Sequence, residues 1–149
     1  HDSHRRQRQM CIRDRNDCIL KTLAGQLKSE RPLFLKIAYN GPKAMEELAS
    51  YDPKNLIVGI LGGGKGTTRD CFELISKSCK YGAKVALFGR KINLAEDQKL
   101  IVKTMRDVVN GMTSKEGVKF YHDQLKKKKI KPDRSLDKDL MITEKVLKL

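Results

Sequence analysis

Short, continuous apolar runs alternate along this chain with longer segments in which apolar residues recur every three or four positions. Continuous apolar runs are typical of buried strands, and the three-to-four spacing is typical of amphipathic helices. The predicted strands cover residues 33–39, 56–61 and 84–88. The predicted helices lie within residues 17–29, 43–51, 67–82, 93–111 and 113–128. This alternation predicts a parallel sheet covered by helices.

Residues that favour helix starts stand at the expected boundaries. Thr113 with Glu116 forms a capping box, and Thr67 with Asp70 three residues later comes close to one. Asn93 is the candidate cap of the helix between them. The periodic segments are therefore supported by end signals as well as by their apolar spacing.

The spacing of the strands suggests the kind of sheet. The predicted strands begin 23 and 28 residues apart, and a (β/α) barrel uses roughly 31 residues per unit. A barrel is therefore expected, although a doubly wound open sheet fits the same order of elements. Three strands alone would leave raw edges, which favours a chain that is part of a larger sheet.

The formal net charge is +14, and part of it lies in an unusual N-terminal segment. Residues 5–15, RRQRQMCIRDR, match residue for residue one reading frame of a transposase adapter used to prepare sequencing libraries. We therefore predict that residues 1–15 are not native and that native sequence begins near Asn16; the alternative is a native basic tail. Residues 1–15 hold five arginines and two aspartates, and the rest of the chain carries +11.

Much of the remaining positive charge lies in Lys126–Lys129 and Lys131. A basic patch can bind nucleic acid, but lysine lacks the planar fork that reads bases, and no aromatic residues are interleaved with this run. Such a run is more often a solvated helix end. Nucleic acid is therefore the lesser alternative, and a small anionic substrate is the expected partner.

The cysteines and the hydropathy pattern limit the kinds of site and the cellular location that we expect. Cys11, Cys18, Cys71 and Cys79 form no CxxC pair, so neither a metal site, nor another cofactor, nor a disulfide framework is expected. No run of about 18 apolar residues occurs, and no apolar segment of a signal peptide follows the basic N-terminus. We expect no membrane partner and a cytoplasmic location.

A glycine-rich segment follows the second predicted strand and precedes a helix. Glycine lets the backbone approach a phosphate closely, and free N–H groups at a helix start bind it. The segment is neither a P-loop, because Gly66 stands where the hydroxyl residue belongs, nor a dinucleotide fingerprint. The alternative is a turn that binds nothing. The predicted phosphate-binding residues are Gly62, Gly63, Gly64, Lys65, Gly66 and Thr67.

A second basic strand end, Gly89-Arg90-Lys91, follows the third predicted strand. Phosphate sites in barrels are often built by the loops of two neighbouring strands together. We therefore predict that Gly89 and Arg90 join the phosphate site. The alternative is that Arg90 and Lys91 are exposed charges without a ligand.

Lys36 interrupts an otherwise apolar strand. A lysine there is costly unless it faces a polar opening or finds a partner. Burial frees a lysine amine for Schiff-base chemistry, since it disfavours the charged form. The alternatives are a structural ion pair and a lysine that reaches solvent from an edge strand. Tyr39 lies nearby and is expected to pack rather than to catalyse.

Phe34-Leu35-Lys36, Gly62-Gly63 and Gly89-Arg90 fall on three successive strand ends. In this order and spacing, residues 17–111 resemble the last three strands of the class I, Schiff-base aldolase superfamily, which includes deoxyribose-phosphate aldolase and archaeal-type fructose-bisphosphate aldolases. The resemblance implies an α/β fold, the last three β/α units of a TIM (β/α)8 barrel over residues 16–112, with a C-terminal helix and charged tail over 113–149.

The resemblance also implies roles for single residues. Lys36 would be the Schiff-base lysine, and Gly62, Gly63, Gly89 and Arg90 would cradle the substrate phosphate. The acid and base residues of the family lie on earlier strands of the parent protein, so residues 16–149 are expected to be inactive alone. The chain departs from the family pattern, which usually has serine or threonine near position 40 and lacks the third glycine and the lysine of the loop.

These observations predict part of a lyase that makes or cleaves a carbon–carbon bond in a phosphorylated sugar through an imine. The alternative is a phosphate-ligand-binding protein, lyase or isomerase without imine chemistry. A homo-oligomer is a candidate assembly of the parent.

Overall fold

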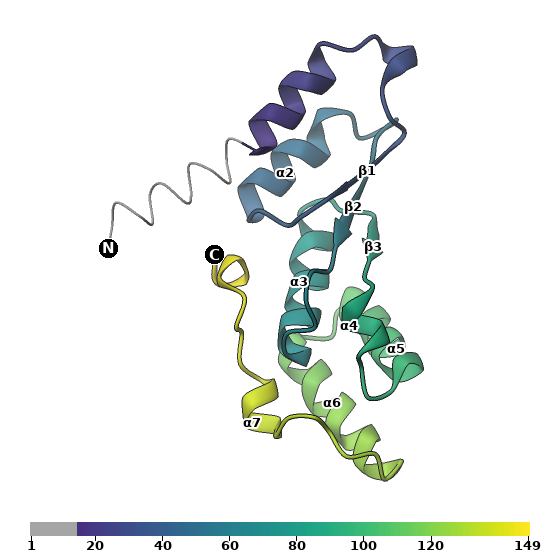
Figure 1. The fold of residues 1–149 in the computed structure, drawn as a ribbon, viewed down its shortest axis with the longest axis vertical. Helices are drawn as coiled ribbons and strands as arrows, with labels where there is room; N and C mark the ends of the chain where they lie inside the picture. Colours follow the sequence, from purple (N-terminus) through teal and green to yellow (C-terminus); the bar gives the residue numbers. More distant parts are fainter. Residues whose placement is uncertain (1–14) are drawn as a thin grey trace, which may run out of the picture.

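The computed structural model describes residues 15–149 (Figure 1). The segment predicted to be non-native lies outside the described residues except for Arg15, which begins a helix over residues 15–24. The elements that follow are η1 (Lys28–Glu30), β1 (Phe34–Ile37), α2 (Pro42–Tyr51), β2 (Ile57–Leu61), α3 (Thr68–Lys80), β3 (Val85–Leu87), α4 (Arg90–Asn93), α5 (Gln98–Val109), α6 (Ser114–Lys127), α7 (Leu136–Asp139) and η2 (Lys145–Lys148).

The three strands form one parallel sheet in the order β1-β2-β3. The register pairs Lys36 with Gly59, and Gly59 with Val85. The connecting helices α2 and α3 lie on the same side of the sheet (Figure 1), as right-handed crossovers require. They cover the sheet face that carries the buried side chains of Val58 and Ile60.

The opposite face of the sheet is open to solvent within residues 15–149. Phe34, Ile57 and Val85 lie on this face and are 41 %, 41 % and 37 % exposed. The continuous apolar runs predict strands that are covered on both faces, and this expectation is wrong for the second face. We call the surface formed by these side chains, together with Lys36, the open face.

The predicted fold, the last three units of a TIM barrel, is wrong. The described residues form a small α/β domain with a three-stranded sheet. Two strand–helix units form as predicted, but the third does not: the chain leaves β3 after three residues and makes the short helix α4. The next helix, α5, packs mainly on α3 and α6. A doubly wound sheet, which needs helices on both faces, is not formed by these residues either.

The helices α3, α5 and α6 pack closely on one another. Gly117 on α6 permits this approach, because an added Cβ would lie 3.0 Å from both Phe72 of α3 and Val108 of α5. Tyr121 and Leu125 continue the same face of α6 and are fully buried. The helix that follows residue 113 is therefore part of the core and not an appendage.

The helix starts follow the sequence in two cases out of three. Both predicted capping boxes form at the starts of α3 and α6. The predicted cap Asn93 is wrong, because Asn93 ends α4, and Asp97 caps α5 by accepting the N–H of Leu100. The short α4 separates the two, and the apolar spacing of α5 does not indicate it.

The predicted charged tail is folded back on the domain. We call residues 132–149 the C-terminal arm. It runs through α7 beside α6 and ends in η2 beside α3 (Figure 1). Leu147 of η2 is buried, and Lys77 Nζ on α3 donates a hydrogen bond to its carbonyl oxygen. The arm thereby crosses the start of α3, where the glycine-rich segment ends.

Candidate phosphate site at the carboxyl edge of the sheet

The carboxyl ends of the three strands meet at one edge of the sheet. Because the strands are parallel and adjacent, the segments that follow them begin side by side. Lys36 lies one residue before the end of β1, the glycine loop (Gly62–Gly66) follows β2, and Gly89 and Arg90 come shortly after β3. The structure therefore brings all three predicted motifs to this edge.

Lys36 is exposed on the open face. Its register partner Gly59 has no side chain, and Phe34 and Leu87 close over that position, since an added Cβ would lie 2.7 Å from Phe34 Cζ and 3.2 Å from Leu87 Cδ1. Among the described residues, the Lys36 ammonium group forms no ion pair. The geometry matches a lysine that reaches solvent from an edge strand, and the amine is accessible to a ligand.

The glycine loop owes its shape to two of its members. Gly63 and Gly66 have φ values of 71° and 59°, in the left-handed region that favours glycine. A Cβ on Gly66 would also lie 2.8 Å from Oδ2 of Asp70. Gly64 meets nothing within 4 Å and is exposed, whereas Gly62 is buried. The loop therefore leaves backbone at Gly63 and Gly64 within reach of a ligand.

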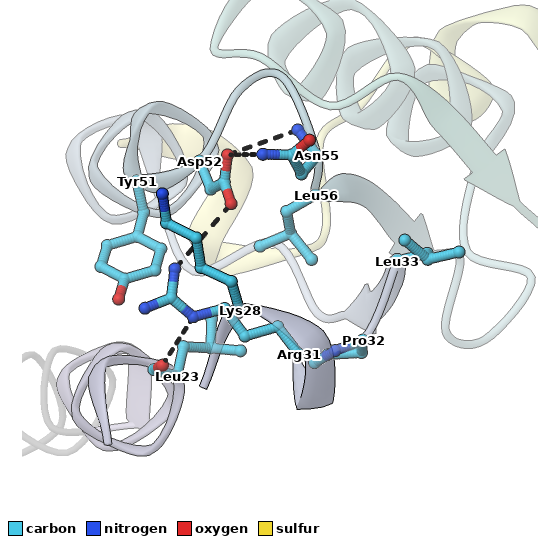
Figure 2. A pocket seen from close by; sticks show the side chains of 9 residues that line it. All are labelled: Leu23, Lys28, Arg31, Pro32, Leu33, Tyr51, Asp52, Asn55 and Leu56. Atoms are coloured by element: carbon cyan, nitrogen blue, oxygen red, sulfur yellow. Dashed lines mark hydrogen bonds and ion pairs between the residues drawn. The ribbon is translucent and has the colours of Figure 1, made fainter. Parts of the chain in front are cut away.

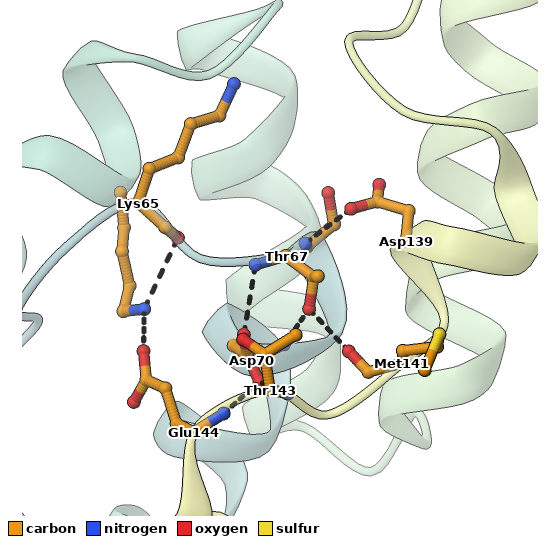
Figure 3. A network of polar contacts seen from close by, with 9 residues as sticks. Lys65, Thr67, Asp70, Asp139, Met141, Thr143 and Glu144 are labelled. Atoms are coloured by element: carbon orange, nitrogen blue, oxygen red, sulfur yellow. Dashed lines mark hydrogen bonds and ion pairs between the residues drawn. The ribbon is translucent and has the colours of Figure 1, made fainter.

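The backbone donors at the start of α3 are already engaged. The N–H of Thr67 donates to Asp70 Oδ2 over 3.0 Å, and the N–H of Asp70 donates to Thr67 Oγ1 over 3.1 Å. The N–H of Thr68 donates over 2.7 Å to Oδ1 of Asp139 in the C-terminal arm. Side-chain oxygens of the chain itself thus occupy donors of the kind that a phosphate would use (Figure 3).

Asp70 is the buried carboxylate that organises this region. Burial alone would raise its pKa, but hydrogen bonds from Thr143, Thr67 and Glu144 hold the pKa below its ordinary value. The Thr143 N–H donates over 2.8 Å and the Glu144 N–H over 3.3 Å. Asp70 therefore stays ionised at neutral pH, and its carboxylate binds backbone N–H groups of the C-terminal arm.

Two lysines of the site also contact the arm. Lys65 pairs with Asp133. Lys91 is fully buried at its side chain, and its Nζ lies 2.7 Å from Oε1 of Glu144 and 3.4 Å from the carbonyl oxygen of Lys65. The sequence did not single out Lys91 as a site residue, because nothing local distinguishes it from its exposed neighbour Arg90.

Little free volume remains between these groups. A small cavity beside the glycine loop and Lys91 has a volume of about 10 Å³, about the space that one water molecule requires. Its lining includes Thr67, Thr68 and the buried Cys71. A phosphate group therefore does not fit between Lys65 and Lys91 in this arrangement of the chain.

Two weakly acidic side chains near the edge stay protonated at neutral pH. Burial raises the pKa of the Cys71 thiol to about 12, although Lys91 opposes the shift. Burial, reinforced by Tyr81 and Glu73, raises the pKa of Tyr39 to about 12. Tyr39 is buried, and its hydroxyl has no hydrogen-bond partner among residues 15–149. Neither group is poised to act as a nucleophile or a base.

A larger cavity lies at the other end of the sheet, beside the residues that precede β1 and β2 (Figure 2). Its volume is about 260 Å³. Within its lining, Arg31 is engaged by the chain itself. Its Nε donates to the Leu23 carbonyl oxygen over 3.1 Å, its guanidinium lies 5.5 Å from the Tyr51 ring centre, and one of its nitrogens is 4.0 Å from Asp52. This cavity is separate from the predicted site.

Comparisons with protein-family models, curated proteins and solved structures find no match to the chain. Within residues 15–149, no helix has the length and apolar character needed to cross a membrane. No group of three or more candidate metal ligands occurs in that range.

Proposed function

We propose that this chain carries the imine-forming lysine and the phosphate-binding groups of an aldolase-like lyase that acts on a phosphorylated sugar. The observation that supports this most directly is the arrangement of the carboxyl edge. Lys36 stands near the end of β1, the glycine loop follows β2, and a basic, glycine-bearing turn follows β3, so the three motifs come at the carboxyl ends of neighbouring parallel strands. Ligands of parallel α/β sheets bind at this edge.

The proposed chemistry begins at Lys36. Its neutral amine adds to the carbonyl carbon of the sugar, the hydroxyl of the adduct takes a proton from solvent and leaves as water, and a protonated imine remains. The bond between the carbons α and β to the imine carbon then breaks, and its electron pair moves onto the imine to give an enamine. The hydroxyl on the β carbon gives its proton to a base and becomes the carbonyl of the released aldehyde. The glycine loop, Lys65 and Arg90 would hold the phosphate and so position the carbonyl at the amine.

The proposal includes a setting for the protein. Cys18, Cys71 and Cys79 are free thiols, which suits a reducing compartment such as the cytoplasm. The C-terminal lysines fit a helix end: Lys126 and Lys127 lie in the last turn of α6, and Lys128 pairs with Asp97 over 2.6 Å. This arrangement favours a small anionic substrate over nucleic acid. A homo-oligomeric parent is also part of the proposal.

Borohydride trapping tests the imine. The chain is incubated with glyceraldehyde 3-phosphate, reduced with borohydride and digested, and adducts are located by mass spectrometry. We expect an adduct at Lys36 that is lost in Lys36→Met and retained in Lys43→Met, which removes another exposed lysine. Labelling of Lys36 no greater than that of other exposed lysines would overturn the Schiff-base proposal.

A second candidate function is binding of a phosphorylated ligand without an imine. It is favoured by the number of anionic oxygens that the glycine loop, the start of α3 and Lys91 already bind from within the chain. In this case Lys36→Met keeps the affinity for glyceraldehyde 3-phosphate and Arg90→Ala loses it. Calorimetric titration of these two variants separates the candidates.

A further inference from the structure

The C-terminal arm places three carboxylates on the candidate phosphate site. Asp133 pairs with Lys65, Asp139 accepts the N–H of Thr68, and Glu144 pairs with the buried Lys91. The three acidic residues are spread over twelve positions of the arm, yet each meets a different donor; Figure 3 shows Asp139 and Glu144. The arm therefore contacts the site through three separate carboxylates and not through a single pair.

These contacts use the chemistry that would recognise a phosphate. Phosphate oxygens bind N–H groups at a helix start and ammonium groups of nearby lysines. Asp139 fills the first role at Thr68, and Asp133 and Glu144 fill the second at Lys65 and Lys91. With about 10 Å³ of free space beside the loop, a ligand phosphate and these carboxylates cannot occupy the donors together.

Hydrogen bonds hold the middle of the arm over this region. Asp70 accepts the N–H groups of Thr143 and Glu144, and the Thr67 hydroxyl donates to the Met141 carbonyl oxygen over 2.7 Å. Met141 is 60 % exposed, but its neighbours Leu140 and Ile142 pack partly buried against the core, and Leu147 is buried within it. Release of residues 132–144 would cost these hydrogen bonds, the ion pairs of Asp133 and Glu144 and some apolar packing. It would also break the 2.7 Å contact between Asp139 Oδ2 and His122 Nε2. The buried Leu147 would keep the end of the arm on α3.

We propose that the C-terminal arm is an intramolecular competitor of the phosphorylated ligand, so that ligand binding requires release of the arm. The inference rests on the proposed function, because it concerns regulation of the same site. A tethered competitor acts at a high effective concentration. The apparent affinity for the ligand equals the affinity of the free site multiplied by the fraction of molecules in which the arm has left the site. By linkage, a ligand that binds the open site also favours release of the arm.

Hydrogen exchange of the unmodified chain provides the main test. Inorganic phosphate and glyceraldehyde 3-phosphate are each added, and exchange is followed in peptides from the glycine loop and from residues 132–144. We expect slower exchange in the loop and faster exchange in the arm, including the N–H groups of Thr143 and Glu144. Slower loop exchange with an unchanged arm would overturn the inference and leave the proposed function standing. No change in either segment would refute both.

Two variants provide an independent test by calorimetric titration with the same two ligands. Glu144→Gln combined with Asp133→Asn removes two competing carboxylates, and we expect roughly tenfold tighter binding, within the usual range of coupling between sites. Asp137→Asn is the matched control, since it removes an exposed charge of the same arm, and its affinity should equal that of the unmodified chain. Equal affinity of all three proteins would overturn the inference.

Discussion

Nζ of Lys91 lies 2.7 Å from Oε1 of Glu144, although 53 residues separate the two in sequence. The Lys91 side chain is fully shielded from solvent, whereas that of Glu144 is 30 % exposed. A buried charge without its partner is costly, while replacing it with an apolar side chain of similar length removes the problem. The pair therefore links the turn after β3 to the C-terminal arm in a way that depends on both charges.

This asymmetry leads to a prediction about stability. Glu144→Gln should lower the free energy of unfolding more than Lys91→Met does, because only the first leaves an unpaired buried ammonium group. Urea unfolding at neutral pH measures both. Lys103→Met removes a 62 % exposed lysine that pairs with Asp107 and should change stability by about 0.5 kcal/mol or less. A larger loss in Lys91→Met than in Glu144→Gln would contradict this account of the pair.

Asp70 should give the chain an acid-sensitive contribution to stability. Its pKa lies below the ordinary value of 3.8, so the contribution is complete above about pH 4 and is lost as pH falls through the folded-state pKa. We expect Asp70→Asn to cost about 1–3 kcal/mol at pH 7, and this difference should shrink toward pH 2. Asp123→Asn, which removes an exposed carboxylate, is the control. A difference that is independent of pH would contradict the assignment.

Two glycines with positive φ allow the cost of a steric clash to be separated from the cost of backbone strain. Gly82 has a φ of 106°, and an added Cβ would lie 2.5 Å from the Ala49 Cβ. Gly111 has a φ of 123°, and an added Cβ would meet nothing within 4 Å. Gly111→Ala should therefore show only conformational strain, about 1–2 kcal/mol, and Gly82→Ala should lose more. Thermal melts of the two variants measure the difference, and equal losses would mean that α2 moves aside freely.

The cysteines should differ sharply in reactivity. Cys71 is buried and its pKa is raised to about 12 by that burial, although it lies in the first turns of α3, where the helix dipole favours a thiolate. Cys79, at the other end of the same helix, is exposed. Iodoacetamide should modify Cys79 in the folded chain and Cys71 only after unfolding. Rapid modification of Cys71 under native conditions would show that the arm and α3 open on the time scale of the reaction.

The elements of the fold could be predicted because their signals are local. Continuous apolar runs predict all three strands, and the residue pairs Thr67–Asp70 and Thr113–Glu116 mark the starts of two helices that form. The failed cap at Asn93 has a local cause as well, since α4 is a short helix without an apolar stripe. Local patterns could not predict that one face of the sheet stays open, because this depends on α5 packing on α3 and α6 after β3.

The same limit applies to the candidate site. Glycine and lysine residues at strand ends could be recognised in the sequence, and the parallel sheet brings them to one edge. The acidic partners Asp133, Asp139 and Glu144 lie in a tail whose composition indicates only a charged segment. Their role depends on contacts across roughly 50 to 70 residues, and no spacing rule reports such contacts. The role of Lys91 cannot be read from the sequence for the same reason.

The open face also has a consequence for how molecules of this protein meet in solution. Phe34, Ile57 and Val85 offer an apolar surface, while the chain as a whole is strongly positive. At low ionic strength, like charge keeps two molecules apart before their apolar surfaces touch. Because the screening length falls from about 10 Å at 0.1 M salt to about 3 Å at 1 M, solubility should decrease as salt is added. Resistance to aggregation through the open face thus depends on positive charges that lie elsewhere on the chain.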